Sequence, residues 1–306
     1  MSIIFFGTPE FAVPSLTGLI GSGEDLRLVV TQTDKLKGRG HGLSAPPVKI
    51  AALEAGLKVL QPGRLRDEIF LGELSSQRPE FIVVVAYGKI LPRDILAIPA
   101  RGCINVHASL LPKYRGAAPI TWAIIRGEEK SGVTTMLMDE GLDTGPVLLQ
   151  SEVPIDKDDT SGSLSKKLST EGASLLTKTL KGLRKGSVNP LPQTGETSYA
   201  PPLKKEDGLI DWSKSAVEIC DFIRAMQPWP GAYCFVNKER IVLLKAQPAH
   251  GDAKPGVIVK AHKGEFIIGT GGGLLSVIQV QPAGKKPMPA SSFVIGRKLA
   301  GGMSAG

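Results

Sequence analysis

Phe81-Ile82-Val83-Val84-Val85-Ala86 is an uninterrupted apolar run with the composition of a buried β-strand. Four further strand-like runs lie on both sides of it, at residues 2–6, 26–33, 104–107 and 133–138. Helix-like segments separate these runs, at residues 45–55, 65–77 and 117–126. Strands that alternate with helical crossovers predict an α/β fold with a doubly wound parallel sheet.

A longer helix is predicted at residues 163–183. Its leucines recur mostly every three or four residues, at Leu164, Leu168, Leu175, Leu176, Leu180 and Leu183. This spacing places them on one face of the helix, and we expect that face to pack on the sheet.

The length of 306 residues indicates two domains, because a domain typically has about 100–200 residues. Residues 189–203 contain four prolines, which is typical of a linker. We therefore predict a first domain at residues 1–188, a linker at residues 189–203 and a second domain at residues 204–306. A predicted helix at residues 216–226 is followed by short strand-like runs at residues 232–236, 241–246, 256–260, 265–269 and 274–280. Such closely spaced strands predict a smaller antiparallel β-barrel.

The composition excludes several classes of protein. Hydrophobic residues make up 42% of the chain and charged residues 22%, which excludes a wholly disordered or fibrous chain. No apolar run approaches the roughly 18–20 residues of a membrane span, and the N-terminus lacks the pattern of a secretory signal. Three cysteines without a CxxC pair argue against a disulfide framework and a zinc finger. We expect a cytoplasmic, monomeric chain with no metal site.

Positive charge is concentrated in the last third of the chain. The whole chain has a net charge of +8, and residues 201–306 contribute 14 basic and 8 acidic side chains to it. Such an excess suits a polyanionic partner, although lysines that only keep a surface soluble produce the same count.

The first strand-like run ends in Gly7-Thr8-Pro9-Glu10-Phe11, where nucleotide-binding sheets carry a glycine-rich turn. The GxGxxG pattern is missing here, which argues against a dinucleotide-dependent enzyme.

The strongest candidates for chemistry are Asn105 and His107, which lie on one predicted strand. Residues two apart share a face of a strand, so the two side chains project together, about 6–7 Å apart. A lone histidine often only satisfies a neighbouring backbone group, but an amide donor beside an imidazole suits a developing oxyanion. We expect Cys103 to face away from Asn105, which excludes it as a nucleophile.

An acidic turn follows the predicted strand at residues 133–138, and we expect it at the same edge of the sheet. It contains Asp139, Glu140 and Asp143. Carboxylates in a turn are usually only solvated turn residues, but one of them can orient His107 and favour its protonated form. The spacing alone does not choose among the three.

The connection at residues 33–49 is long for a βα loop, which usually has about 2–6 residues. Its basic residues Lys35, Lys37, Arg39 and His41 alternate with glycines and a leucine. The loop is either a mobile solvated surface or a flexible basic segment that binds a phosphate backbone.

Three motifs together resemble the signature of the 10-formyltetrahydrofolate-dependent formyltransferases. They are Asn105-Val106-His107, Ser109-Leu110-Leu111-Pro112 and Asp143-Thr144-Gly145. Further motifs resemble the members of this family that act on charged initiator tRNA, and they reach nearly to the end of the chain. These are the stretches at residues 7–11, 37–40, 206–212, 228–232 and 284–288.

The resemblance implies a Rossmann-like catalytic domain joined to an OB-like β-barrel that binds tRNA. The co-substrate is then 10-formyltetrahydrofolate, along Ser109-Leu110-Leu111-Pro112 and Tyr87-Gly88-Lys89-Ile90-Leu91. The formyl group passes directly from N10 of the folate to the α-amino group of methionine on the tRNA. By the same resemblance, Asn105 and His107 stabilise the tetrahedral oxyanion, and Asp143 holds and polarises His107.

Three other functions are compatible with parts of the sequence. A formyltransferase that acts on a small amine and a formyl-folate hydrolase share the three catalytic residues. Neither needs the basic loop at residues 35–41 or the charge excess after residue 200. A non-catalytic tRNA-binding module explains the charge but leaves Asn105, His107 and Asp143 as coincidence.

Overall fold

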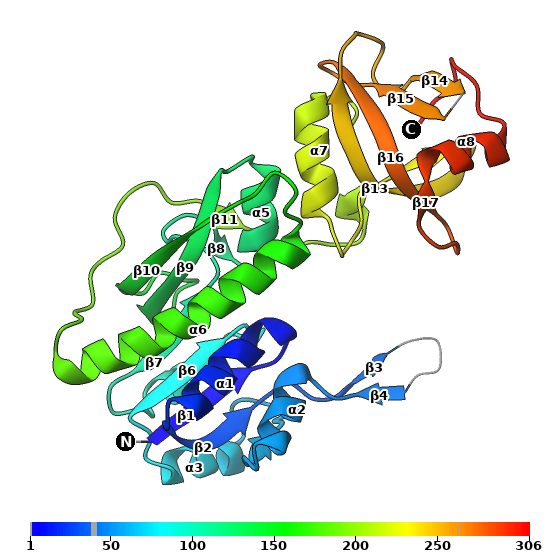
Figure 1. The fold of residues 1–306 in the computed structure, drawn as a ribbon. Coiled ribbons are helices and arrows are strands. Elements are labelled where there is room, and N and C mark those ends of the chain that lie inside the picture. Colours follow the sequence, from blue (N-terminus) through cyan, green and yellow to red (C-terminus); the bar gives the residue numbers. More distant parts are fainter. Residues whose placement is uncertain (1, 38–41, 263) are drawn as a thin grey trace. The chain divides into compact units, whose positions relative to one another are not determined.

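The computed structural model of the protein describes residues 2–37, 42–262 and 264–306 (Figure 1). The chain divides into two compact units, which we call unit 1 and unit 2. Unit 1 consists of Met1–Pro119, Lys130–Pro154 and Ser165–Pro201, and unit 2 consists of Ile120–Glu129, Ile155–Leu164 and Pro202–Gly306. Two short segments, at residues 120–129 and 155–164, therefore belong to unit 2 although unit 1 surrounds them in the sequence, and residues 189–201 belong to unit 1.

A seven-stranded sheet forms the centre of unit 1. In spatial order its strands are β10 (Val147–Pro154), β9 (Lys130–Leu137), β7 (Cys103–His107), β6 (Phe81–Val85), β1 (Ser2–Gly7), β2 (Asp25–Val30) and β5 (Val59–Leu60). The strands from β7 to β5 pair in parallel, which confirms the predicted parallel sheet for most of its width. Strand β9 is the exception, because it pairs antiparallel with both β7 and β10.

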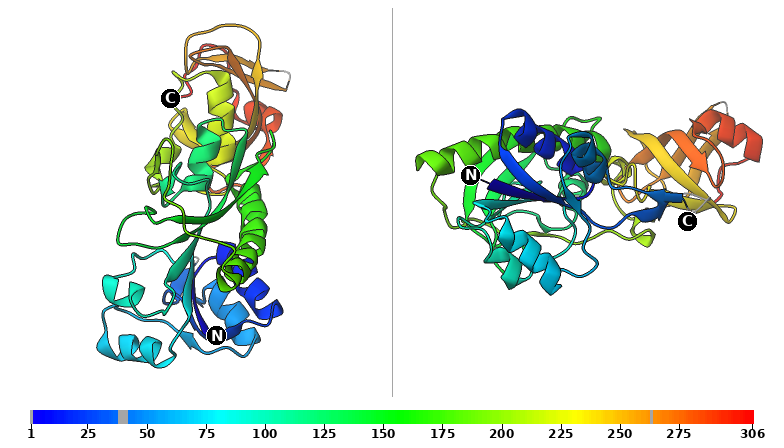
Figure 2. Two further views of the ribbon diagram at one scale, coloured as in Figure 1. Left: turned by 90° about the vertical axis from the view of Figure 1, so that its left-hand side faces the viewer. Right: turned by 90° about the horizontal axis from the view of Figure 1, so that it is seen from below.

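Helices cover both faces of this sheet, as the doubly wound prediction requires. On one face lie α1 (Val13–Gly21) and α6 (Ser161–Lys185), and α2 (Pro47–Glu54) contacts α1. A Cβ at Gly172 of α6 would lie 3.0 Å from Val106, so this glycine lets the helix approach the sheet closely. On the other face, α3 (Glu68–Ser76) and α4 (Arg93–Leu96) pack on the cores of β1, β2 and β6. Figure 2 shows α6 running along the sheet from two further directions.

Short paired segments complete unit 1. Strand β8 (Arg115–Gly116) pairs in parallel with β11 (Tyr199–Ala200), and β3 (Lys35–Lys37) forms a hairpin with β4 (Gly42–Ser44). The 3-10 turn η1 (Glu10–Ala12) precedes α1. Among the residues that the structure describes, no helix is both long and apolar enough to cross a membrane.

Unit 2 is an antiparallel half-barrel, which agrees with the smaller antiparallel barrel domain predicted from the sequence. Its strands are β12 (Tyr233–Val236), β13 (Glu239–Ala249), β16 (Leu274–Pro282), β15 (Glu265–Gly269) and β14 (Ile258–His262) in spatial order, with β17 (Met288–Pro289) beside β16. The turn η2 (Glu206–Gly208), α7 (Ala216–Ala225) and α8 (Ala290–Arg297) also belong to it, as does most of α5 (Pro119–Ile125). Helix α7 packs on β13 and α8 packs on β15 and β16.

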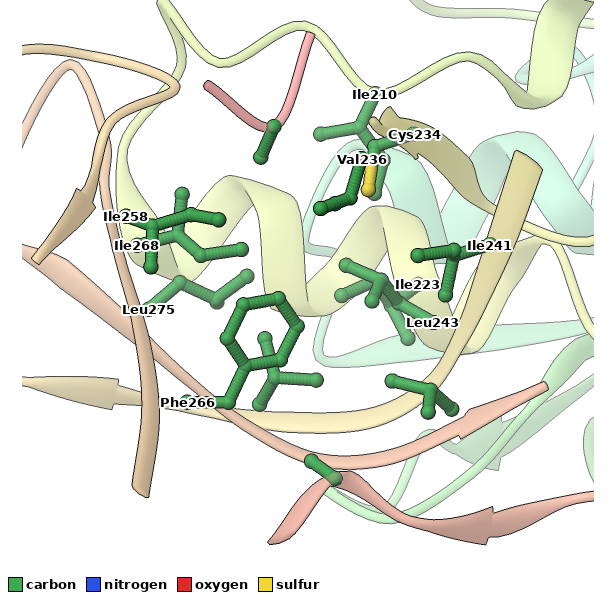
Figure 3. Packing of buried hydrophobic residues seen from close by; sticks show 14 of the residues in the cluster. Ile210, Ile223, Cys234, Val236, Ile241, Leu243, Ile258, Phe266, Ile268 and Leu275 are labelled. Atoms are coloured by element: carbon green, nitrogen blue, oxygen red, sulfur yellow. The ribbon is translucent and has the colours of Figure 1, made fainter. Parts of the chain in front are cut away.

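The core of unit 2 lies between α7 and the curved sheet. Phe266 projects into this core among aliphatic side chains, which include Ile223, Leu243 and Leu275 (Figure 3). Phe266 is 1% exposed, and the centroid of its ring lies 6.1 Å from that of Phe293. Unit 2 therefore has an apolar core of its own.

We expect Phe266→Ala to lower the free energy of unfolding of unit 2 by about 3–5 kcal/mol, because it removes buried apolar surface and leaves a cavity. Tryptophan fluorescence during urea denaturation reports the unfolding of unit 2, since Trp122, Trp212 and Trp229 all belong to it. Ile295→Ala is the control, because Ile295 is 71% exposed and its replacement should cost less than about 0.5 kcal/mol. Equal losses for the two variants would contradict the described core.

Candidate active site

Strand β7 positions the first two polar groups of the site. Asn105 and His107 lie two residues apart on it, and both side chains turn toward Asp143. Val106, between them, points to the opposite face and toward α6. His107 is buried at 6% exposure, and Asn105 is half-buried. The alternation of the strand therefore provides an amide and an imidazole on the same face.

The Asp143 carboxylate joins these two side chains. Its Oδ1 atom accepts a hydrogen bond of 3.4 Å from Asn105 Nδ2, and its Oδ2 atom lies 3.7 Å from His107 Nδ1. The backbone N–H of Gly116 donates a hydrogen bond of 2.8 Å to the same Oδ2 atom. Asp139 instead bonds within its own turn, and Glu140 lies 3.5 Å from Arg93. Of the three acidic candidates, the structure brings Asp143 to the histidine.

The turn that carries Asp143 starts at a different edge of the sheet from the one expected. Because β9 runs antiparallel to β7, Leu137 pairs with Ile104, and Met138 donates a backbone hydrogen bond to Cys103. The turn thus begins beside the amino end of β7 and folds back to reach Asn105 and His107. Asp143 adopts a left-handed backbone conformation, with φ of 52°, at the end of this path.

The His107 ring is oriented by a backbone carbonyl. Its Nε2 atom lies 2.9 Å from the carbonyl oxygen of Tyr114. A carbonyl oxygen only accepts hydrogen bonds, so Nε2 carries a proton and Nδ1 faces Asp143. At 3.7 Å from the carboxylate, Nδ1 is the ring atom that can gain or lose a proton during a reaction. A positive charge on the ring is then stabilised by the neighbouring carboxylate.

The segment that follows β7 is fixed to the neighbouring strands. Thr134 of β9 donates to the Ser109 carbonyl at 2.6 Å and accepts from the Leu111 N–H at 3.1 Å. Gln150 of β10 donates to the Leu111 carbonyl at 2.9 Å. Ser109, Leu111 and Pro112 are buried, and Leu110 is half-buried. This stretch is therefore a rigid wall next to His107.

The stretch from Tyr87 to Leu91 has buried ends and an exposed middle. The Tyr87 ring packs on Phe6, with 5.1 Å between the ring centroids, and burial raises the pKa of its hydroxyl to about 12. Leu91 is also buried, whereas Gly88, Lys89 and Ile90 are exposed. Ile90 is 84% exposed, which leaves an apolar side chain in contact with solvent.

Comparisons with known proteins identify the family of this chain. Residues 1–180 match the protein family described as "Formyl transferase", and residues 202–298 match "Formyl transferase, C-terminal domain". A curated relative from Thermodesulfovibrio yellowstonii, named methionyl-tRNA formyltransferase, is 56% identical over 303 residues, which are 99% of this chain and 98% of the relative. The chain belongs to the formyl transferase family.

Solved structures show the same fold at low sequence identity. An N-formyltransferase from Helicobacter canadensis, in complex with folinic acid and dTDP-3-aminofucose, has a TM-score of 0.69 and 20% identity. The match covers 92% of this chain and 98% of that one. HypX from Aquifex aeolicus, in complex with tetrahydrofolic acid, has a TM-score of 0.65 and 18% identity. The match covers 96% of this chain, which spans only 47% of HypX.

The basic loop of this formyl transferase, at residues 33–49, contains the paired strands β3 and β4. Lys35 is exposed on β3, and Lys37 ends that strand. Arg39 and His41 lie outside the described residues. The base of the hairpin is held by Lys49, whose ammonium group donates to both carboxylate oxygens of Asp34 at 2.9 and 2.8 Å and to Gln61 at 2.7 Å. The bonds from Lys49, together with one of 2.8 Å from Gln61 Nε2, lower the pKa of the Asp34 carboxyl.

The expected orientation of the Cys103 side chain was wrong. It lies two residues before Asn105 on β7 and therefore shares the face of Asn105 and His107. Its sulfur lies 4.0 and 3.9 Å from the carbonyl oxygens of Ile95 and Leu96, inside the core under α4. Burial raises the pKa of its thiol to about 12, so the group stays neutral and is no nucleophile.

Three contributors to the site have no signal of their own in the sequence. Tyr114 and Gly116 act through a backbone carbonyl and a backbone N–H, which every non-proline residue carries. Gln193 lies in the segment predicted as a linker and contacts the backbone of the Asp143 turn. The sequence could indicate the Gly116 position only through its glycine, because its φ of 115° strongly favours that residue.

Gly116→Ala should destabilise the fold more than Gly195→Ala. The two glycines have similar φ values, 115° and 102°, but only at Gly116 would a Cβ meet the Ala200 carbonyl, at 2.8 Å, whereas at Gly195 nothing lies within 4 Å. We expect the extra loss of unfolding free energy to be about 1–3 kcal/mol, as for other overpacked sites. Urea denaturation followed by circular dichroism measures both variants. Equal losses would show that the approach of β8 to β11 is not constrained in this way.

Proposed function

We propose that this chain transfers the formyl group of 10-formyltetrahydrofolate to the α-amino group of methionine on charged initiator tRNA. The observation that carries the proposal is the 56% identity, over both units, with a relative named methionyl-tRNA formyltransferase. The arrangement of Asn105, His107 and Asp143 supports it, because it supplies the groups that acyl transfer to an amine needs.

In the proposed reaction, the methionine nitrogen forms a bond to the formyl carbon, and the bond from that carbon to N10 then breaks. The amide N–H of Asn105 and the protonated ring of His107 stabilise the negative oxygen of the tetrahedral intermediate. The methionine nitrogen loses a proton and N10 gains one, and Nδ1 of His107 is placed to relay it. The α-amino group of an esterified amino acid is a weak base, so catalysis consists mainly of positioning and charge stabilisation.

Asp143 acts through the other two side chains. Its carboxylate holds the Asn105 amide by Oδ1, and it stabilises positive charge on His107 by Coulombic attraction at 3.7 Å. The Gly116 N–H keeps Oδ2 in place. In our proposal Asp143 orients and polarises the site and forms no covalent bond.

The folate is proposed to lie between two stretches of unit 1. The fixed segment from Ser109 to Pro112 is one wall, where Leu110 keeps some exposure. The exposed loop at residues 88–90 supplies backbone groups and the Ile90 side chain, which suits a heteroaromatic ring with polar edges. Tyr87 and Leu91 support that loop from the core, because both side chains are buried.

The tRNA is proposed to bind the basic hairpin and the exposed cations of unit 2. Lys35 and Lys37 belong to β3 of the hairpin, and Arg39 and His41 lie between its two strands in the sequence. Exposed lysines of unit 2 include Lys245, Lys254, Lys285, Lys286 and Lys298. Contacts of this kind neutralise phosphates without reading sequence, so they position the tRNA and leave selection to other groups.

A comparison of acceptors tests the proposal directly. The enzyme is given 10-formyltetrahydrofolate with charged initiator tRNA, free methionine, a nucleotide-linked amino sugar or water alone. We expect kcat/KM for the charged tRNA to exceed that for either small amine by several orders of magnitude. Preferred transfer to a small amine, or release of formate in water at the same rate, would contradict the proposal in favour of the corresponding rival.

We expect His107→Ala and Asn105→Ala each to lower kcat about 10²- to 10³-fold, as the loss of one oxyanion donor typically does. The affinity for the folate should stay within a few-fold, because neither residue belongs to the proposed folate walls. Asp143→Asn should be strongly non-additive with His107→Ala, since the two residues act as a unit. Steady-state kinetics on purified variants measures these effects, and near-normal turnover of a variant would exclude its residue from the mechanism.

Replacement of Lys35, Lys37 and Arg39 together by alanine should raise KM for charged tRNA far more than KM for the folate. If these residues contact phosphates, the dependence of log KM on log salt should also become shallower, by about one for each lost contact. The control is the matching replacement of three exposed lysines of α6, Lys178, Lys181 and Lys185. An unchanged KM for tRNA would make this hairpin an ordinary surface loop.

A further inference from the structure

The segment at residues 189–201 is bound to the active site at several points, although its composition is that of a linker. Leu191 exchanges two backbone hydrogen bonds of 2.8 Å with Val147 at the start of β10. Farther along, the Ser198 hydroxyl accepts from the Tyr114 N–H at 2.9 Å, and the Ser198 carbonyl accepts from the Arg115 N–H at 2.9 Å. Pairing of β11 with β8 then continues this attachment to Gly116. The segment thus runs beside two backbone stretches of the site. One is residues 114–116, and the other is the turn that carries Asp143.

Gln193 connects these two stretches through its side chain. Its amide nitrogen donates hydrogen bonds of 2.8 Å to the carbonyl oxygens of Asp143 and Gly145. Its amide oxygen accepts two hydrogen bonds from the Arg115 guanidinium, at 3.1 Å from Nε and 2.6 Å from Nη2. Both N–H donors and the oxygen acceptor of the Gln193 amide are therefore used. Among uncharged side chains only asparagine carries the same amide group, and it is one methylene shorter.

Each of the two stretches that Gln193 connects contains a residue in a strained backbone conformation. Asp143 has a φ of 52° and Tyr114 a φ of 60°, which are left-handed conformations that cost about 1–3 kcal/mol in residues with a side chain. Arg115 stands between the Tyr114 carbonyl that orients His107 and the Gly116 N–H that binds Asp143. A change in the separation of the two stretches therefore alters the contact of Asp143 with His107 and with Gly116.

We propose that Gln193 is a positioning residue for formyl transfer, which holds the Asp143 turn at a fixed separation from residues 114–116. It aligns the Asp143 carboxylate with Asn105 and His107 and touches no reacting atom itself. This proposal rests on the proposed function for its kinetic readout and on the geometry of the site for its structural one.

Two substitutions and one control test the role. Gln193→Ala removes every hydrogen bond of the side chain. Gln193→Glu keeps an acceptor for Arg115 but replaces the amide nitrogen, which donates both hydrogen bonds, by an oxygen that repels the Asp143 and Gly145 carbonyls. Thr194→Ala is the control, because Thr194 is an exposed neighbour in the same segment.

We expect both Gln193 variants to lower kcat about 10- to 100-fold, as misplacement of catalytic groups by about 1 Å does. KM for folate and for charged tRNA should stay within about threefold, and Thr194→Ala should have the wild-type kcat. In the Asp143→Asn background, Gln193→Ala should cause little further loss, because the group that it positions is already gone. A full, additive loss in that background, or an unchanged kcat, would overturn the positioning role.

A second measurement does not depend on activity. In the NMR spectrum of enzyme with ¹⁵N-labelled histidine, Gln193→Ala should shift the ring resonances of His107, and Thr194→Ala should leave them in place. Unchanged His107 resonances in Gln193→Ala would overturn the proposal even if the wild-type enzyme proved inactive on methionyl-tRNA. Inactivity of the wild-type enzyme contradicts only the proposed function, so the two failures are distinguishable.

Discussion

The hydrogen bond from the Gly116 N–H to the Asp143 carboxylate joins the separate pieces of chain from which the site is built. Asp143 comes from the turn between β9 and the edge strand β10, and Gly116 follows the strand that carries Asn105 and His107. The bond orients one carboxylate oxygen and leaves the other for Asn105. Because Gly116 also lies against Ala200, the close pairing of β8 with β11 fixes the donor. The site therefore depends on backbone geometry as much as on its side chains.

The sheet supplies the second constraint. The alternation of side chains along β7 places a packing residue and the proposed catalytic residues on opposite faces of the strand. Val106 faces α6 across the small Gly172, while Asn105 and His107 face the Asp143 turn. The same face holds Cys103 farther back, where burial keeps its thiol neutral. Unit 2 has its own apolar core around Phe266 and contributes none of the three proposed catalytic residues. Its exposed lysines fit a role in binding the acceptor.

Sequence periodicity predicted most of the strands of unit 1 and the leucine face of α6, because those residues are buried in regular elements. It missed α1, β10 and the β3–β4 hairpin, whose patterns are short or interrupted. It also did not predict the direction of β9, since the same apolar pattern fits a strand that runs either way. For that reason the Asp143 turn was expected at the wrong edge. The choice of Asp143 over Asp139 and Glu140 came from resemblance. Tyr114 and Gly116 were found only in the structure because they act through backbone atoms. Gln193 was found only there because its side chain contacts a turn that lies far from it in the sequence.

The tautomer of His107 is the most direct test of the central claim, which is that the Tyr114 carbonyl and Asp143 together orient this ring. In two-bond ¹H–¹⁵N correlation spectra of the enzyme with ¹⁵N-labelled histidine, His107 is assigned by its disappearance in His107→Gln. At a pH where the ring is neutral, we predict that the proton resides on Nε2, because this atom lies 2.9 Å from the Tyr114 carbonyl oxygen. Residence of the proton on Nδ1 would contradict the account.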